Sequence, residues 1–212
     1  VIAIPEAENG VNADEIADGI QTEVTLPTGT LEGDAITLTV TPAGGGTPVE
    51  ITHVITGPEV ANGVSEVTIP NDLNGITEDG DYSIVATVTD KAGNSSAPST
   101  PIDVTVDTIA PSAPTIDSVN EDGVAGSVTA GEGAETVEIT LTPRDEADLP
   151  AGATDNGDGS FTITVPVEAD GSFSTGVTPK DGTDVSAEAV DAAGNHSTPT
   201  VEVGVDTTAP GE

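Results

Sequence analysis

Apolar and polar residues alternate along most of this chain. Residues 35–41 and 161–165 place Ile, Leu, Val or Phe at every second position, with Thr between them. A period of two in β-branched residues is typical of strands that bury one face. Gly, Pro, Asn and Asp cluster between the runs, as they do in turns. No segment carries a helical stripe, so the pattern predicts an all-β protein.

The runs have the spacing of two β-sandwiches. In the first half we expect strands near residues 1–5, 20–26, 35–41, 49–55, 64–70, 82–89 and 101–107. In the second half we expect them near 114–119, 126–130, 136–142, 160–166, 172–177, 184–190 and 199–206. Asn156-Gly157 and Asp158-Gly159 lie between two runs and predict a hairpin connection. Seven strands in about 100 residues is the size of one Ig-like sandwich.

Two motifs occur twice, about 100 residues apart. Residues 90–94, Asp-Lys-Ala-Gly-Asn, return as Asp-Ala-Ala-Gly-Asn at 191–195, and Val-Asp-Thr-Ile-Ala-Pro at 106–111 returns as Val-Asp-Thr-Thr-Ala-Pro at 205–210. Self-similarity at a fixed period indicates tandem modules. We therefore expect two Ig-like β-sandwiches arranged end to end, with domain 1 over residues 1–108 and domain 2 over residues 109–212.

Charge narrows the range of partners. The chain has 38 acidic and 3 basic side chains, which give a formal net charge of −35. A surface this acidic argues against nucleic-acid binding and against direct contact with anionic membranes. The chain has no Cys, so disulfides and thiolate metal sites are excluded. We expect a monomer whose partners are neighbouring Ig-like repeats of the same chain.

Catalytic chemistry has little support in the sequence. His53 and His196 fall in a strand and in a loop, and neither belongs to a recognisable catalytic motif. One Tyr and two Phe are too few to build the aromatic platforms of sugar-processing clefts. Tyr82 has a structural explanation, since it starts a strand where Ig-like sandwiches carry a corner tyrosine. Asp184 is expected at the same position of domain 2. We predict that the protein is not an enzyme.

The repeated motifs resemble those of the bacterial Ig-like repeats of giant surface adhesins. Those are RTX adhesins that Gram-negative bacteria secrete by a type I system and keep at the outer membrane, and they are strings of acidic sandwich domains with calcium at or near the junctions. The resemblance covers both halves of the chain. It implies an extracellular location on the bacterial cell surface and a structural role in cell adhesion and biofilm formation.

Topology brings the acidic loops of such domains to their ends. We letter the seven expected strands of each domain A, B, C, C′, E, F and G in chain order. The N-terminus, the B–C loop and the F–G loop then share one end of the sandwich, and the A–B segment, the E–F loop and the C-terminus share the other. In a head-to-tail pair, Asp79, Asp81 and Asp107 of domain 1 would face Asp191 and Asn195 of domain 2, with Asp14, Glu15 and Asp18 at the same end. Carboxylate and amide oxygens are calcium ligands, so we expect a Ca²⁺ ion there.

The same geometry leaves two half-sites for further repeats of a longer array. Asp90 and Asn94 would face a preceding domain, and Asp181, Asp184 and Asp206 would face a following one, beginning near Ala209-Pro210. The alternative is that these Asp and Asn residues only cap turns and keep the loops soluble, as they often do.

The sequence thus predicts a calcium-rigidified extender, a spacer that projects a distal ligand-binding region of an adhesin from the cell. Short linkers that contain Pro111 favour a stiff connection. Two alternatives stay open. One is a module that itself binds a glycan, ice or a host protein, and the other is a spacer anchored in a Gram-positive cell wall.

Overall fold

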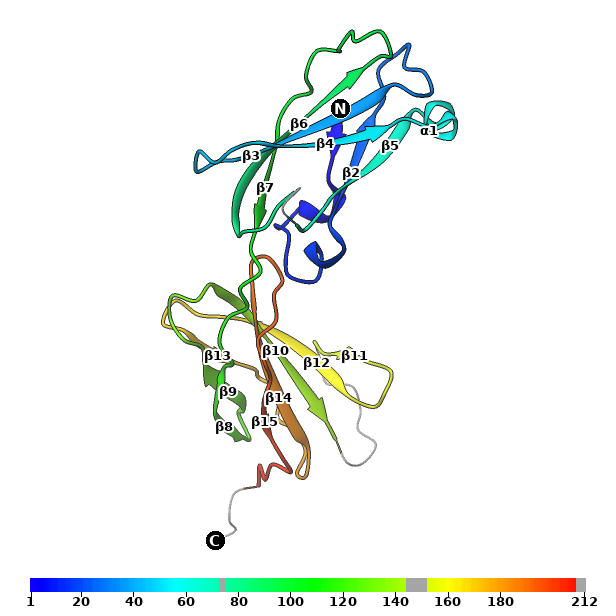
Figure 1. The fold of residues 1–212 in the computed structure, drawn as a ribbon. Coiled ribbons are helices and arrows are strands. Elements are labelled where there is room, and N and C mark those ends of the chain that lie inside the picture. The colour runs from blue at the N-terminus through cyan, green and yellow to red at the C-terminus, as the bar shows by residue number, and fades with distance from the viewer. Residues whose placement is uncertain (73–74, 144–151, 209–212) are drawn as a thin grey trace. The chain divides into compact units, whose positions relative to one another are not determined.

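The computed structural model describes residues 1–72, 75–143 and 152–208 (Figure 1). The chain divides into two compact units, Val1–Ile109 and Ala110–Glu212, and each is described by itself. Both units are built from two antiparallel sheets, so the expected all-β, Ig-like sandwich fold is confirmed. The Ala209-Pro210 pair of the second motif lies outside the described residues.

The first domain pairs a three-stranded sheet, β1-β2-β5, with a four-stranded sheet, β4-β3-β6-β7. Inward positions of these strands are Ile, Leu and Val, and the side chains of Ile36, Leu38 and Ile84 are completely buried between the sheets. The elements are β1 (Ile2–Ala3), η1 (Pro5–Ala7), η2 (Ile16–Asp18), β2 (Ile20–Thr25), β3 (Ala35–Pro42), β4 (Val49–Val54), α1 (Gly57–Asn62), β5 (Val64–Ile69), β6 (Gly80–Thr89) and β7 (Ile102–Val106).

The second domain pairs the sheet β13-β9-β8 with a five-stranded sheet, β11-β12-β10-β14-β15. Its core is built around Val137, Ile139 and Phe173. The expected hairpin is confirmed, since Thr154 pairs with Thr162 and Asp155 with Phe161 across the Asn-Gly and Asp-Gly turns. The strands are β8 (Thr115–Asn120), β9 (Gly123–Ser127), β10 (Ala134–Thr142), β11 (Thr154–Asp155), β12 (Phe161–Pro166), β13 (Ser172–Ser174), β14 (Asp184–Asp191) and β15 (Thr200–Glu202).

One short α-helix was not predicted from the sequence. The connection from β4 to β5 contains α1, with a capping box between Thr56 and Glu59, a proline in the first turn and Gly63 in the left-handed conformation at its end. These are ordinary helix start and stop signals. Six residues are too few to show a helical stripe, which is why the periodicity missed the helix.

Strand β9 begins three residues earlier than expected, because Gly123 and Gly126 interrupt the strand pattern in the sequence. A Cβ atom on Gly126 would lie 2.5 Å from the Phe173 ring and 2.0 Å from the Thr115 carbonyl oxygen. The glycine therefore lets an aromatic ring of the neighbouring strand β13 pack onto the backbone. Glycine weakens strand propensity in a sequence but is typical of such close approaches.

The tyrosine corner is present in the first domain, and a threonine takes its position in the second. The Tyr82 hydroxyl donates a 2.7 Å hydrogen bond to the Glu78 carbonyl oxygen. Tyr82 lies two residues before Ile84, which pairs with Val40, and the matching pair in the second domain is Val185 with Leu141. The residue two before Val185 is Thr183, which is buried. The expectation that Asp184 occupies the corner is therefore wrong by one residue.

Candidate metal-binding ends of the domains

Hydrogen bonds identify the two ends of the first domain. The Thr25 amide donates to the Val1 carbonyl oxygen, and the Lys91 side chain packs on Gly33, so the N-terminus and the B–C and F–G loops share one end. At the other end, Gly80 of β6 pairs with Val106 of β7. Val11 of the A–B segment joins this end, since it is hydrogen-bonded to Thr105 and Asp107.

Three expected ligands lie at the C-terminal end of the first domain. Thr108 donates from its hydroxyl to Asp79 Oδ1 at 2.8 Å, and Thr105 donates to Asp81 Oδ1 at 2.7 Å. Asp107 Oδ1 accepts the Ile109 amide at 3.1 Å. The β6–β7 pairing therefore brings Asp79, Asp81 and Asp107 to one edge of the domain, with each carboxylate bonded to β7 or to the segment that follows it.

The acidic residues of the A–B segment belong to a turn that is closed by local hydrogen bonds. Asn12 Oδ1 accepts the amides of Asp14 and Glu15 at 3.0 Å, and Glu15 Oε2 accepts the Asn12 amide at 3.0 Å. The mutual capping of Asn12 and Glu15 forms a turn that leads into η2, which includes Asp18. This segment shares the C-terminal end because Val11 bonds to β7.

The F–G loop of the first domain is a capped turn. Asp90 Oδ1 accepts the amides of Ala92 and Asn94 at 2.9 and 2.8 Å, and Asp90 Oδ2 accepts the Asn94 side-chain amide at 2.8 Å. Hydrogen bonds from the Asn94 side chain and backbone lower the pKa of Asp90. Both oxygens of this carboxylate therefore serve the turn, as the turn-capping alternative predicts.

The second domain repeats this loop. Asp191 Oδ1 accepts the Asn195 amide at 2.8 Å, and Asp191 Oδ2 accepts the Asn195 side-chain amide at 2.9 Å. The Ser197 hydroxyl accepts the Ala189 amide at 2.9 Å, as Ser96 accepts that of Val88 in the first domain. The conserved spacing of the repeated motif thus has a local cause, the closing of the F–G loop.

The C-terminal end of the second domain is also rich in carboxylates. Asp181 Oδ1 accepts the amide and hydroxyl of Thr207, and Asp181 Oδ2 accepts the Thr208 hydroxyl at 2.6 Å. The bond from the Thr208 side chain is the main cause of a lowered pKa at Asp181. Asp206 accepts the Thr208 amide, and Asp184 of β14 accepts the Gly204 amide. A hollow of about 250 Å³ at this end is lined by Asn120, Glu121, Asp122, Asp206, Thr207 and Thr208.

The donor chemistry of these ends suits calcium, but one domain end does not gather enough ligands. Calcium takes six to eight oxygens. Among residues 1–72, 75–143 and 152–208, no three acidic or histidine side chains converge as a metal-binding group. Asp90, Asp181 and Asp191 already accept hydrogen bonds on both oxygens. The pairing of ligands across the domain junction therefore stays a prediction.

A polar cluster that the sequence analysis missed surrounds Glu59. This carboxylate accepts hydrogen bonds from the Thr56 amide and hydroxyl at 2.7 and 2.6 Å, from Ser65 at 2.5 Å and from His53 Nε2 at 2.8 Å. Burial raises its pKa, but the bonds from Ser65, Thr56 and His53 outweigh burial and lower it from 4.5 to about 2. Glu59 thus joins α1 to β4 and β5. In the sequence, the Thr-x-x-Glu spacing indicates the helix cap but not the contacts of Glu59 with His53 and Ser65.

The family comparison addresses the first domain directly. Residues 5–108 match the model of the bacterial Ig-like domain. The first domain is a bacterial Ig-like domain. The second domain has the same two-sheet architecture and the same F–G loop and Val-Asp-Thr motifs. A search of curated protein sequences gives no match to the chain.

Similar solved structures include animal and bacterial proteins. The first three fibronectin domains of chicken CNTN1 align over 93% of this chain with 13% identity and a TM-score of 0.50, which supports the tandem sandwich fold alone. A Ca²⁺-stabilized adhesin that helps an Antarctic bacterium bind ice aligns over 98%, with 24% identity and a TM-score of 0.42. A bacterial ice-binding adhesin of 1.5 MDa aligns over 98%, with 23% identity and a TM-score of 0.43.

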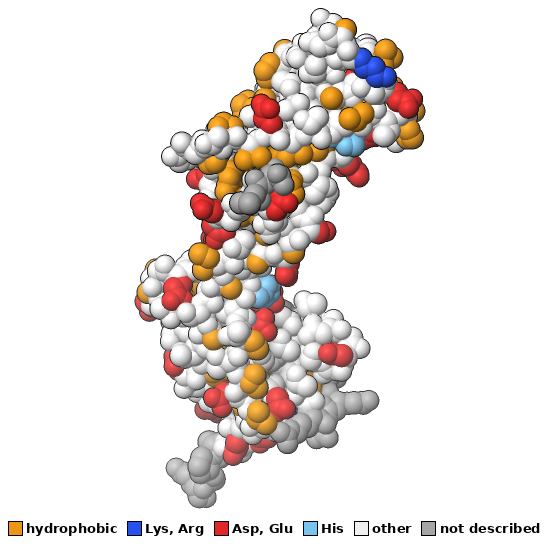
Figure 2. All heavy atoms as spheres, viewed as in Figure 1, with side chains coloured by type: hydrophobic (Ala, Val, Ile, Leu, Met, Phe, Trp, Pro, Cys, Tyr) orange, Lys and Arg blue, Asp and Glu red, His pale blue; other side chains and the backbone are white. Residues whose placement is uncertain are grey.

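The chain spans 62%, 49% and 63% of these three structures, respectively. In the part of the chain that the structure describes, no helix is long and apolar enough to cross a membrane. Acidic side chains are spread over the visible surface of both domains, with few basic ones (Figure 2).

Proposed function

We propose that this chain is an extender segment of a bacterial surface adhesin, which holds a distal ligand-binding region away from the cell. The observation that carries the proposal is the repetition of one acidic sandwich, with the same F–G loop and the same Val-Asp-Thr motif in each copy. The bacterial Ig-like family of the first domain supports a bacterial source. The role is structural and performs no chemistry.

We further propose that calcium stiffens the array. A divalent cation would neutralise carboxylates that otherwise repel one another, by about 4 kcal/mol per pair at 4 Å and an effective dielectric near 20. Asp79, Asp81 and Asp107 would supply oxygens from one end of the first domain, and the Thr105 and Thr108 hydroxyls orient two of them. The excess negative charge would keep a long array soluble.

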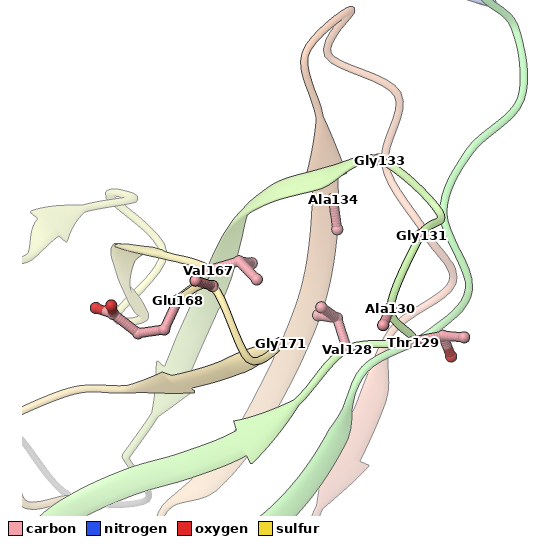
Figure 3. A pocket seen from close by; sticks show the side chains of 10 residues that line it. Val128, Thr129, Ala130, Gly131, Gly133, Ala134, Val167, Glu168 and Gly171 are labelled. Atoms are coloured by element: carbon pink, nitrogen blue, oxygen red, sulfur yellow. The ribbon is translucent and has the colours of Figure 1, made fainter.

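The buried state of the aromatic residues weighs against the glycan-binding alternative. Sugar-binding sites stack rings on exposed aromatic side chains, but the chain's three aromatic residues, Tyr82, Phe161 and Phe173, are all buried. A cavity of about 170 Å³ lies between the B–C and C′–E loops of the second domain. It is lined mainly by Gly, Ala and Val, and the Glu168 carboxylate points away from Val128 and Ala134 (Figure 3). Such a lining offers few groups that could orient a polar ligand.

An ice-binding face would need a flat, regular array of threonines. On the outer face of the β4-β3-β6 sheet, Thr52, Thr37 and Thr87 form one cross-strand row. The neighbouring rows interrupt it, since Glu50 and Val85 flank Thr39 and since Val54 and Thr89 flank Ala35. The described threonines of this face therefore fit β-propensity better than an ordered array.

Calcium-dependent melting tests the proposal. Binding to the native state alone raises stability by about 2.7 kcal/mol at a hundredfold excess over Kd. The intact chain should melt at a higher temperature in millimolar calcium than in chelator, and small-angle scattering should show a narrower distance distribution. Equal melting temperatures and equal distributions would remove calcium from the proposal.

A matched pair of variants locates the ion. Asp107→Asn should weaken calcium binding, while Asp103→Asn removes the same charge from an exposed position four residues earlier on β7 and should leave binding unchanged. Both should keep a β-type circular dichroism spectrum. Equal losses in the two variants would indicate general charge screening and not a site at the end of the domain.

A further inference from the structure

Asn-Gly pairs are chemically reactive, and the folded chain treats its pairs differently. The backbone nitrogen of the glycine can attack the side-chain amide carbon of the asparagine, because glycine has no side chain to hinder the approach. The chain has four such pairs, and three lie wholly within the described residues: Asn9-Gly10, Asn62-Gly63 and Asn156-Gly157. Local hydrogen bonding decides which of them can react.

Two pairs are held by hydrogen bonds. The Gly63 amide donates to the Glu59 carbonyl oxygen at 2.8 Å at the end of α1. The Gly157 amide donates to Asp155 Oδ1 at 2.8 Å, and the Asn156 side-chain amide donates to Ser160 and Thr162 at 2.9 and 3.0 Å. In both pairs the attacking nitrogen must first lose its partner.

The third pair is unrestrained. Asn9 is exposed and lies in the irregular stretch between η1 and Val11, and Gly10 has a φ of 103°. Within the described residues, neither the Asn9 side chain nor the Gly10 amide takes part in a hydrogen bond. The nucleophile and the amide carbon are therefore both available, and the left-handed backbone favours glycine at position 10.

We propose that Asn9 is a site of spontaneous deamidation. Hydroxide removes the Gly10 amide proton, and the nitrogen forms a bond to Asn9 Cγ. The bond from Cγ to the side-chain nitrogen then breaks, and ammonia leaves with a proton from water. Water opens the resulting succinimide at either carbonyl, which yields an aspartyl or an isoaspartyl residue at position 9. No oxidant, reductant or enzyme is required.

The product changes the C-terminal end of the first domain. The aspartyl form turns Glu8-Asn9-Gly10-Val11 into the sequence that the second domain already has at 121–124, Glu-Asp-Gly-Val. Either product adds one negative charge two residues from Val11, whose carbonyl oxygen accepts the Asp107 amide at 3.0 Å. The isoaspartyl form also lengthens the main chain by one carbon just before this contact.

Peptide mapping of the aged chain tests the site. The intact protein is incubated at mildly alkaline pH, digested and analysed by mass spectrometry with electron-transfer fragmentation, which separates aspartyl from isoaspartyl products. We expect deamidation at Asn9 to be at least about fivefold faster than at Asn62 or Asn156, the factor that one typical hydrogen bond produces. In urea the three sites should react at similar rates.

Two variants serve as controls for this test. Asn9→Gln should abolish the fast product, because a glutamine must form a larger ring, and it leaves Gly10 and the fold intact. Asn9→Asp should reproduce the charge change of the aged protein without the chain lengthening. Equal rates at Asn9, Asn62 and Asn156 in the folded chain, or an intact Asn9 while the other two react, would overturn the proposal. Since no calcium is involved, neither result bears on the extender function.

Discussion

The last strands of the two domains carry the same alternating valines but bury them differently. In β7, Val104 and Val106 are 2% and 1% exposed, whereas Val203, which matches Val104 when the Val-Asp-Thr motifs are aligned, is 67% exposed and Val201 is 53% exposed. Ile84 of β6 pairs with Ile102, but Val185 of β14 pairs with Glu202. Val104 and Val106 therefore face the core of the first domain, whereas Val201 and Val203 of the second face solvent, and Val205, which follows Gly204, packs on the core.

A difference of one residue explains this reversal. Asp90 lies eleven positions after Asp79, but Asp191 lies only ten after Asp181. The F–G loop fixes the position of the strand that precedes it, β6 or β14. The Asp-Gly pair fixes the register of the last strand, β7 or β15, against that strand. Because side chains alternate with a period of two, losing one residue turns Val201 and Val203 outward. Gly204, with a φ of 62°, then precedes Val205, which packs on the core again. Repeated motifs thus conserve loops without conserving the side-chain direction of the strand between them.

The edges of these strands differ as well. Val11 forms a parallel bridge to Val106 and covers the end of β7. In the second domain the A–B connection is a tight hairpin, in which Asn120 pairs with Gly123. There the buried Val185 pairs with an exposed charged residue of the edge strand, Glu202, and charges on an edge strand discourage edge-to-edge association.

The largest effect should come from the corner that only the first domain has. Tyr82→Ala removes a buried ring and should destabilise the first domain by about 3–5 kcal/mol. Tyr82→Phe removes only the hydrogen bond to Glu78 and should cost about 1 kcal/mol. Hydrogen exchange measured on β3 and β10 peptides would assign the loss to one domain. Comparable losses of stability in the two variants would show that the hydroxyl, and not the ring, makes the main contribution of Tyr82.

The valine comparison predicts a second, smaller contrast. Val104→Ala deletes buried methyl groups and should cost about 2 kcal/mol, because each buried methylene-sized group contributes about 0.8 kcal/mol and a cavity adds to the loss. Val203→Ala should lie within about 0.5 kcal/mol of the parent, as exposed substitutions do. Urea unfolding measures both. A large loss at Val203 would mean that the segment that follows β15 buries this valine in solution.

Glu59, in the connection between the two sheets of the first domain, gives a pH-dependent prediction. Glu59 has its pKa lowered from 4.5 to about 2, so its contribution is present above pH 4.5 and is lost as the pH falls towards 2. Glu59→Gln should cost about 1–2 kcal/mol at neutral pH and progressively less in this window. The fluorescence of Tyr82, the chain's one tyrosine, reports on the first domain alone. A constant difference between parent and variant across the window would contradict this role.

The smallest expected effect is a gain. The Thr22 hydroxyl is buried in β2, and it is the one buried side-chain polar atom of the described residues without a hydrogen-bond partner. Thr22→Val keeps the shape and removes the unpaired hydroxyl, so it should stabilise the first domain by about 1 kcal/mol. Thermal melts followed by Tyr82 fluorescence would measure this, with the exposed Thr68→Val as the control. A lower melting temperature would indicate that Thr22 binds an internal water.

Much of the fold was readable from local patterns. Strand β3 follows directly from its alternation, and the turns of the Asp-x-Ala-Gly-Asn loops follow from side chains that bond their own backbone a few residues on. A further signal was overlooked. Asp-Gly-Ser-Phe occurs at 158–161 and at 170–173, and in both copies the Asp caps the Ser amide next to a buried Phe at the beginning of a strand, β12 or β13.

Other features required contacts that no local pattern contains. The Glu59 cluster joins His53, Thr56 and Ser65 from three consecutive elements, and Gly126 makes sense only under the Phe173 ring. The sequence by itself determined the alternation, the turns and the acidic ends, because these depend on neighbours along the chain. Only the tertiary structure decided which face each last strand buries and where Thr183 lies. Register is set by pairing between strands, and a single residue between two fixed points is enough to reverse it.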